Sequence, residues 1–359
     1  MLATLASGLL LAPALSLDVE GATRAFPSSA AGKPGSSAEA AVKKPAASTT
    51  QVSSSKQRSS SRRYSSSRSR ARRARLARAR AAQRAREMRE LAVPRFKVDA
   101  DGALVPDVRA AAAVIYNPST QEVLWEENGG NPRSIASITK VMTAVVYLAD
   151  EVDVTREVEI ENVDVHRASH TYLRRRERVR VDDLLHLLLI ASDNAAARTL
   201  ARLSPWGPDG FVDRMNAKSE ELGLTQTHYT DPSGLDPDNV SSARDMARLI
   251  AYASADERIA AIMRKADHQL TTSRRTLTVH NTNRLVGTDL DVRGGKTGFI
   301  RSSGYCLATL LRLPHTDQQL AVVILGARSS TGRFMETRHL VNWAASKAEQ
   351  FLGVQPPSQ

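Results

Sequence analysis

The chain has 359 residues and a mass of 39.0 kDa, so it can hold one large domain or two small ones together with appendages. Hydrophobic residues make up 42% of the chain, which is enough for a sizeable core, and the single cysteine, Cys306, excludes an internal disulfide framework and a cysteine-rich metal site. The formal charge of +12 is concentrated in one segment. Residues 56–89 hold fourteen Lys or Arg and one acid, Glu87, a net +13 that leaves −1 for everything else.

The first 92 residues predict no folded domain. Residues 1–22 contain an apolar run followed by small residues that a signal peptidase could cut, and the run is too short for a transmembrane helix. We interpret this segment as a secretory signal, although no Lys or Arg precedes the run, and the alternative is an untargeted N-terminus. Residues 23–92 are rich in Ser, Ala and Arg and predict a disordered basic linker, within which residues 70–90 could form a transient solvated helix.

The charge of this linker is compatible with three roles. The simplest is a solvated spacer, and the second is a tail that binds anionic wall polymer or lipid headgroups. The third, nucleic-acid binding, is disfavoured because only Tyr64 supplies an aromatic side chain among the basic residues. We therefore expect no specific nucleic-acid partner.

The folded region is expected to begin near Val93. Residues 110–116 and 122–125 are β-rich runs, and the Asn-Pro-Ser-Thr sequence at 117–120 between them favours a hairpin turn. A helix is expected next, from 137 to about 150.

The middle of the folded region is predicted to be helical and its end to return to strands. After a charged segment of short strands and loops at 158–181, apolar periodicity predicts helices at 182–190, 195–203, 210–222, 242–253 and 256–263. Strands are expected after Arg293, at 304–313 and at 320–326, and a final amphipathic helix at 332–351. The early hairpin must pair with the late strands to close one sheet. The pattern therefore predicts an α+β fold with a five-stranded antiparallel sheet, flanking helices and an inserted all-helical subdomain.

A pair of residues at the start of the 137–150 helix suggests nucleophilic chemistry. Ser137 stands at a plausible helix N-cap, and Lys140 lies three residues later on the same face of the first turn. A serine becomes a nucleophile when a base lies within hydrogen-bond reach, and a lysine can be that base if burial and neighbouring charge favour its neutral form. Ser-x-x-Lys alone is a weak signal because it occurs by chance.

Two further motifs strengthen this signal. Ser192-Asp193-Asn194 interrupts two helices, and Lys296-Thr297-Gly298 lies at the start of a strand, so three short motifs occur in a fixed order and in their expected contexts. In this respect the chain resembles the penicillin-recognising serine acyltransferases. Its flanks resemble the D-alanyl-D-alanine carboxypeptidase and endopeptidase family of low-molecular-mass penicillin-binding proteins, over about 108–350 and most clearly at 135–144, 230–235, 241–247 and 294–304.

The resemblance implies catalytic roles for four residues. Ser137 would attack the carbonyl of the penultimate D-alanine and form an acyl-enzyme, and Lys140 would take its proton. Asn194 would hold Lys140 or the substrate amide, and Ser192 could relay a proton to the leaving amine.

The resemblance also implies a substrate-binding wall. Lys296 would add positive charge beside Ser192, helping to keep Lys140 neutral, and the edge strand from Thr297 through Gly298 to Phe299 would pair with an extended peptide. The N–H groups of Ser137 and Phe299 would form the oxyanion hole. Arg333 follows the last strand, where the family places an arginine that meets a substrate carboxylate, and the alternative is a surface charge at a helix start.

The chain is thus expected to be a serine-type peptidase, a hydrolase of cell wall biogenesis that acts on peptidoglycan peptides, determines cell shape and is inhibited covalently by β-lactam antibiotics. The family domain would span 93–354, with a tail at 355–359. A β-lactamase is disfavoured because 228–237 holds no Glu-x-x-Asn loop. Because the sequence ends directly after the last helix, we favour the D-alanyl-D-alanine endopeptidase branch, periplasmic and without a stable membrane anchor.

Two alternatives remain open: a carboxypeptidase that trims pentapeptides and a catalytically idle protein that binds peptidoglycan.

We expect no cofactor and no metal. The histidines are scattered, and the pair His166 and His170 has no acid at a ligand spacing.

Overall fold

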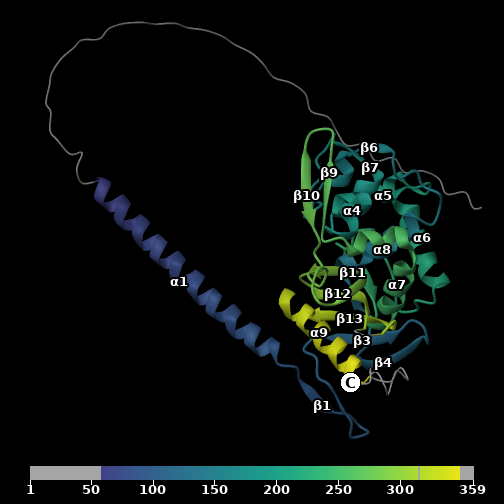
Figure 1. The fold of residues 1–359 in the computed structure, drawn as a ribbon. Coiled ribbons are helices and arrows are strands. Elements are labelled where there is room, and N and C mark those ends of the chain that lie inside the picture. Colours follow the sequence, from purple (N-terminus) through teal and green to yellow (C-terminus); the bar gives the residue numbers. More distant parts are fainter. Residues whose placement is uncertain (1–57, 314–315, 348–359) are drawn as a thin grey trace, which may run out of the picture. The chain divides into compact units, whose positions relative to one another are not determined.

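The computed structural model describes residues 58–313 and 316–347, and Figure 1 shows their helices and strands. The predicted signal at 1–22 and tail at 355–359 lie outside the described residues. One five-stranded antiparallel sheet has the strand order β11-β12-β13-β3-β4. Its strands are β3 (Ala112–Asn117), β4 (Glu122–Glu127), β11 (Asp291–Ile300), β12 (Gly304–Arg312) and β13 (Gln319–Ala327). The early hairpin pairs with β13, which confirms the predicted α+β fold.

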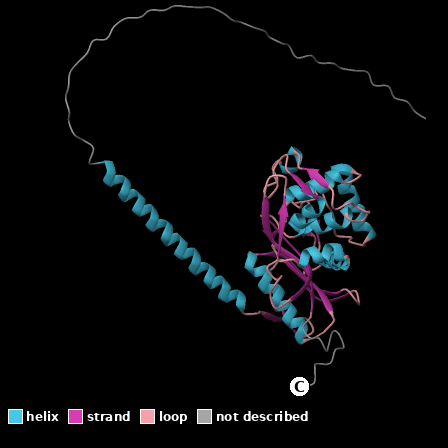
Figure 2. Cartoon of the chain, turned by 45° about the horizontal axis from the view of Figure 1, so that its top comes forward, coloured by secondary structure: helices cyan, strands magenta, loops and turns pink. Residues whose placement is uncertain are grey.

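Both faces of the sheet are buried by packed helices, and alternate residues of each strand point to opposite faces. Val114 and Val323 lie in one apolar cluster with the helical block, whereas Ile115 and Val322 lie in a second cluster under α9 (Ser330–Ser346). Figure 2 shows the magenta strands between the cyan helices of the two layers. β11 forms the edge of the sheet, so one side of this strand is not paired with another strand of it.

The residues between β4 and β11 form the inserted, mainly helical subdomain. Most helices lie within a few residues of the expected positions, because strong apolar periodicity fixes them. The helices located in this way are α2 (Thr139–Tyr147), α4 (Val181–Leu189), α5 (Asn194–Leu203), α6 (Gly207–Glu221), α7 (Ala243–Ala255) and α8 (Glu257–Arg264). The short α3 (Asn162–Val165) was not predicted, because it lies in the charged segment where short strands and loops were expected.

In the residues that the structure describes, four small two-stranded sheets accompany the main sheet. They pair β1 (Phe96–Val98) with β2 (Leu104–Pro106), β5 (Arg133–Ser134) with β8 (Val240–Ser241), β6 (Glu157–Glu159) with β7 (Arg178–Arg180), and β9 (Asp267–Thr271) with β10 (Thr276–His280). The β9–β10 hairpin was not predicted from sequence. It is largely polar and buries only Leu270 and Val279 fully, so it lacks the apolar signal of a strand.

The basic segment differs from the sequence expectation. The structure has a continuous helix, α1 (Arg58–Ala92), where a disordered linker with at most a transient helix was expected. Its Ala and Arg residues favour helix, and from Ser69 onward nearly every side chain is exposed. Leu91, near its end, is buried and its carbonyl accepts a hydrogen bond from His339. None of the helices in the described residues combines the length and apolar character that a membrane crossing requires.

Candidate active site

Ser137 and Lys140 lie at the junction of the sheet and the helical subdomain. Ser137 is in a single 3₁₀ turn, Ala136–Ile138, that precedes α2, so the expectation that it caps a helix is wrong: the residue before α2 is Ile138. Ala136 has φ +49°, a left-handed conformation that is unusual for alanine and is found at functional sites. The turn still places the two side chains on one face, with Lys140 Nζ 3.0 Å from Ser137 Oγ.

The amine of Lys140 is completely buried and surrounded by oxygen atoms. Nζ donates to Asn194 Oδ1 at 2.7 Å and to the carbonyl of Ser233 at 2.5 Å. A neutral lysine has two N–H donors and one lone pair. The two acceptors can therefore take both donors of the neutral amine, which leaves its lone pair for the hydroxyl of Ser137.

Burial also sets the protonation of this lysine. The pKa of Lys140 is lowered to about 7, mainly because desolvation penalises the ammonium, and the charge of nearby Arg198 contributes to the same shift. Asp231 and Asp193 act in the opposite direction. Desolvation is the largest cause of the shift, whereas the sequence had led us to expect a contribution from the charge of Lys296.

The Ser192-Asp193-Asn194 segment lies across from Ser137 at the start of α5. Ser192 has φ +61°, and Asp193 caps α5 by accepting from the backbone N–H of Ala196 at 3.0 Å. The Nδ2 atom of Asn194 donates to the carbonyl of Ala168 at 2.8 Å, so its Oδ1 faces Lys140. The left-handed residue and the cap thus turn Ser192 and Asn194 toward the same space.

Lys296 connects this segment to the edge strand. Its Nζ donates to Ser192 Oγ at 2.8 Å and to the carbonyl of Thr297 at 2.9 Å, and burial together with the charge of Lys140 lowers the pKa of Lys296. The Thr297 hydroxyl donates to that of Thr282 at 2.7 Å. Lys140 thus holds the hydroxyl of Ser137, and Lys296 holds that of Ser192.

Gly298 brings the edge strand close to Ser137. A Cβ atom at this position would lie 3.2 Å from the backbone nitrogen of Ser137 and 2.5 Å from the carbonyl oxygen of Ile135. Only glycine allows this approach, because any side chain would displace β11 or the serine turn. The backbone of β11 thus lies beside the N–H of the serine.

Phe299 and Arg333 complete the wall formed by β11. Phe299 is 51% exposed and its ring stacks on Tyr305 with a centroid distance of 4.2 Å. Arg333 is not a surface charge: it is 7% exposed, and its guanidinium donates to the carbonyl of Gly298 at 3.1 Å and to that of Cys306 at 3.2 Å. Burial lowers the pKa of Arg333 to about 10.

One loop of the site was not assigned a role from the sequence. The carboxylate of Asp231 accepts from the backbone N–H groups of Ser233, Gly234 and Asp236, and from the side chain of Asn239. These bonds shape the loop so that the Ser233 carbonyl points at Lys140. The Asp-x-Ser-Gly spacing, typical of a side chain that bonds its own turn, was the available signal.

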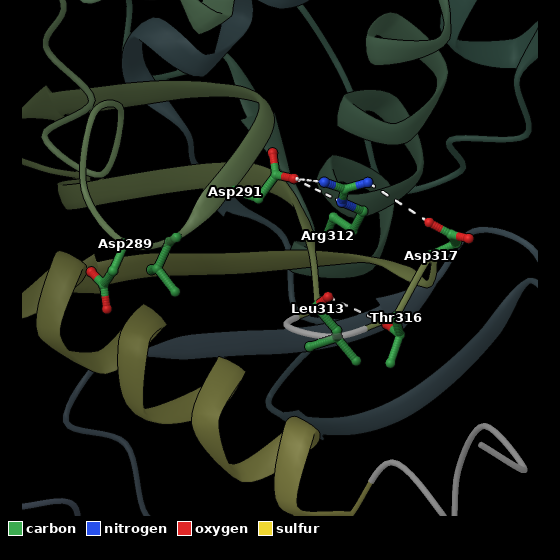
Figure 3. Close-up of a pocket in the computed structure, with 7 residues that line it drawn as sticks. Asp289, Asp291, Arg312, Leu313, Thr316 and Asp317 are labelled. Carbon is green, nitrogen blue, oxygen red and sulfur yellow. Dashed lines mark hydrogen bonds and ion pairs between the residues drawn. The ribbon is translucent and has the colours of Figure 1, made fainter. Parts of the chain in front are cut away.

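A separate cavity of about 390 Å³ lies at the far end of β11, and its lining is drawn in Figure 3. It contains three carboxylates, but arginines already neutralise them. Asp291 and Asp317 pair with Arg312, and Asp289 pairs with Arg338 at 2.7 Å. This cavity shares no residue with the site around Ser137.

Comparisons with known proteins give independent evidence on the family and fold of the chain. A family model described as D-alanyl-D-alanine carboxypeptidase matches residues 99–329. The D-alanyl-D-alanine endopeptidase of Escherichia coli K12 is 31% identical over 249 residues, which cover 68% of this chain and 80% of that protein. The D-alanyl-D-alanine carboxypeptidase DacC of the same strain is 30% identical, over 70% of this chain and 65% of the other. The solved DD-transpeptidase of Streptomyces K15 superposes with a TM-score of 0.63 and 25% identity, over 67% of this chain and 98% of that one.

The fold and these relatives define the class of the protein as the serine DD-peptidases of the penicillin-binding type. Within that class, the chain belongs to the D-alanyl-D-alanine carboxypeptidase family, and this confirms the resemblance inferred from its motifs.

Proposed function

We propose that this protein is a D-alanyl-D-alanine endopeptidase that cuts peptidoglycan cross-links through an acyl-enzyme on Ser137. The observation that carries the proposal is the buried amine of Lys140, 3.0 Å from Ser137 Oγ and hydrogen bonded to two other acceptors. A pKa of about 7 leaves much of this amine neutral at neutral pH, as a general base requires.

In the first half of the reaction, the lone pair of Lys140 takes the proton of Ser137 as Oγ attacks the carbonyl carbon of the D-alanine in the scissile bond of the cross-link. The carbonyl oxygen gains negative charge, and the N–H groups of Ser137 and Phe299 donate hydrogen bonds to it. The close approach at Gly298 supports this role, because it brings the backbone of β11 beside the serine nitrogen.

The peptide bond then breaks and its nitrogen must receive a proton. Lys296 holds Ser192 Oγ at 2.8 Å, which supports Ser192 as the donor of this proton, and the proton that Lys140 took from Ser137 replaces it on Ser192. The amine therefore leaves with one proton, and Lys140 is neutral again. Water next attacks the carbonyl of the acyl-enzyme while neutral Lys140 takes its proton. Lys140 then returns this proton to Ser137 Oγ as the ester bond breaks, which releases the shortened peptide.

Substrate binding uses main-chain and charge contacts. β11 is the edge of the sheet, so an extended peptide can add to Thr297, Gly298 and Phe299 as a further strand. Arg333, beside the carbonyl of Gly298, would meet the carboxylate of the leaving residue.

The choice of the endopeptidase over the carboxypeptidase activity is supported by the Escherichia coli relative of that name, whose length the match covers to 80%. Purified cross-linked muropeptide dimers and pentapeptide monomers, digested separately and analysed by chromatography, distinguish the two activities. We expect the dimers to disappear first. Loss of the terminal D-alanine from monomers, with dimers intact, would favour the carboxypeptidase instead.

The idle wall-binding alternative is tested by a fluorescent penicillin. We expect covalent labelling of the native chain and none of a Ser137→Ala variant, because acylation by a β-lactam uses the same nucleophile and base. An unlabelled native chain that still sediments with peptidoglycan would support the idle protein.

We further propose that the protein is exported to the periplasm, in keeping with a wall substrate and the apolar run in residues 1–22. Penicillin labelling in a periplasmic extract tests this location. Labelling that remains with the cytoplasmic fraction would contradict it.

A further inference from the structure

The strands β1 and β2 form a short hairpin that follows α1 in the chain (Figure 1). Residues that pair directly across two strands share a face, so Val98 and its partner Leu104 lie on one face together with Phe96. These three side chains are 67%, 59% and 44% exposed. Together they form the outer face of the hairpin, an apolar patch of the kind that marks an interaction surface.

The opposite face of the hairpin is fixed to the body of the fold. Val105 packs against the apolar cluster under α9. Its partner across the hairpin, Lys97, forms an ion pair with Glu127 at the end of β4. The hairpin is thus held by one face, with its apolar side chain packed and its charge paired. This attachment keeps the outer face turned to solvent and available to a partner.

The segment directly before the hairpin carries strong positive charge. Residues 69–92 of α1 hold nine arginines and two glutamates, and nearly all their side chains are exposed. The end of this helix is tied to the fold, because His339 donates to the carbonyl of Leu91 at 2.8 Å. Since α1 ends at Ala92 and β1 begins at Phe96, the basic segment and the outer face are neighbours along the chain.

We propose that the β1–β2 hairpin docks on a membrane surface that contains anionic lipid, with Phe96, Val98 and Leu104 in the interfacial region. Such a surface offers anionic headgroups to the arginines of α1 and an apolar boundary to the outer face. A soluble anionic polymer would match the arginines alone and leave the outer face in water. Because Asp99 and Asp101 occupy the turn, the hairpin lies along the surface and does not enter it tip first.

An environment-sensitive dye on the outer face tests the docking directly. Val98→Cys supplies the attachment point, and the natural Cys306 is fully buried, so the dye reacts selectively at position 98. The full chain is mixed with vesicles of phosphatidylglycerol and phosphatidylcholine, or of phosphatidylcholine alone. We expect a blue shift with the anionic vesicles only, because the dye then leaves water. The matched control is Val163→Cys, at a similarly exposed valine of α3, which should show no shift.

Vesicle sedimentation measures how much the outer face contributes to binding. A variant with Phe96→Thr, Val98→Thr and Leu104→Thr keeps residues that favour strands and removes most of the apolar patch. We expect its partition onto anionic vesicles to fall about tenfold at fixed salt, while the salt dependence stays the same because the arginines of α1 are intact. Val163→Thr is the control and should bind like the native chain. Thermal unfolding checks that both variants are folded.

Each outcome decides the proposal. An unchanged dye spectrum with anionic vesicles, or full binding by the threonine variant, would overturn the docking of the hairpin. A blue shift that appears without vesicles and grows with protein concentration would identify a second copy of the chain as the occupant, and would overturn it too. Penicillin labelling of Ser137 is a separate measurement, so the proposed function and the docking surface stand or fail independently.

Discussion

The amine of Lys140 illustrates how burial can create reactivity from an ordinary side chain. The groups that bond its Nζ accept hydrogen bonds without carrying a charge, so desolvation outweighs the opposing effect of Asp231 and Asp193 on the pKa. The sequence indicated the pair with Ser137 from spacing alone. It did not indicate the acceptor from Ser233, because that carbonyl lies 93 positions away and is placed by a loop.

The pH dependence of acylation follows from this lysine. In the proposed mechanism the neutral amine is the base, so with a pKa of about 7 the rate of penicillin acylation should rise with pH through about 7 and fall about tenfold per unit below it. Arg198 lowers this pKa, so Arg198→Gln should move the midpoint upward. Stopped-flow acylation between pH 5 and 9 measures both curves, and a flat profile would contradict the role of Lys140.

Gly298 offers a test of the oxyanion arrangement. Gly298→Ala adds a Cβ that must push β11 away from the serine turn, so acylation should fall by about 10²–10³, as for loss of an oxyanion donor. The control is Gly130→Ala, where the new Cβ meets only Arg244 at 3.6 Å and should leave acylation unchanged. Thermal unfolding of both variants separates a misplaced strand from a misfolded chain. Full activity in Gly298→Ala would show that the approach is not needed.

At the scale of elements, apolar periodicity determined which predictions were accurate. The helices α4 and α5 and the strands β12 and β13 bury long apolar runs, and they were located from sequence within a few residues. The 3₁₀ turn at Ser137, with Ala136 in the left-handed region, was missed, because tertiary contacts impose that conformation on a residue that does not favour it.

The N-cap of α5, Asp193, affects both the stability of the fold and the position of the site residues beside it. Asp193→Ala removes the acceptor for Ala196 and for the Thr171 hydroxyl, so we expect a loss of about 1–3 kcal/mol in the free energy of unfolding. Ser192 and Asn194 flank this residue, so acylation should fall as well. Calorimetry and penicillin labelling measure the two effects.

A second cap is the matched control for that experiment. Ser242→Ala removes the N-cap of α7, which accepts from Asp245 at 3.0 Å, and α7 carries none of the proposed catalytic residues. It should lower stability by a similar amount and leave labelling intact. Equal labelling of the two variants would mean that the α5 cap has no role in positioning the site.

At the scale of the whole molecule, the folded region and the basic helix differ in how well the sequence predicted them. The fold and the motifs of the site could be predicted, because each motif and each strand is recognised from a short contiguous stretch of sequence. The β1–β2 hairpin could not, because its strands have only three residues each and bury little apolar surface. The continuity of α1 was also missed, since exposed Ala and Arg give no periodic signal.

We propose that α1 binds anionic polymer or lipid headgroups. From Ser69 to Ala92 its side chains include nine arginines against Glu87 and Glu90. The full chain should bind vesicles that contain anionic lipid and release them as salt rises, whereas a variant with these arginines changed to glutamine should not bind. Sedimentation with vesicles measures this, and neutral vesicles are the control. Undiminished binding by the variant would remove the role of the helix.

The open edge of β11 has a consequence for substrate range. Main-chain hydrogen bonding does not depend on side-chain identity, so the proposed pairing of a substrate peptide with this strand would tolerate chemical variation in the stem peptides of the wall. A bacterium that altered those side chains would not remove the proposed pairing of its stem peptides with β11. Only a change to the backbone itself, such as N-methylation or an ester in place of an amide, would remove the match.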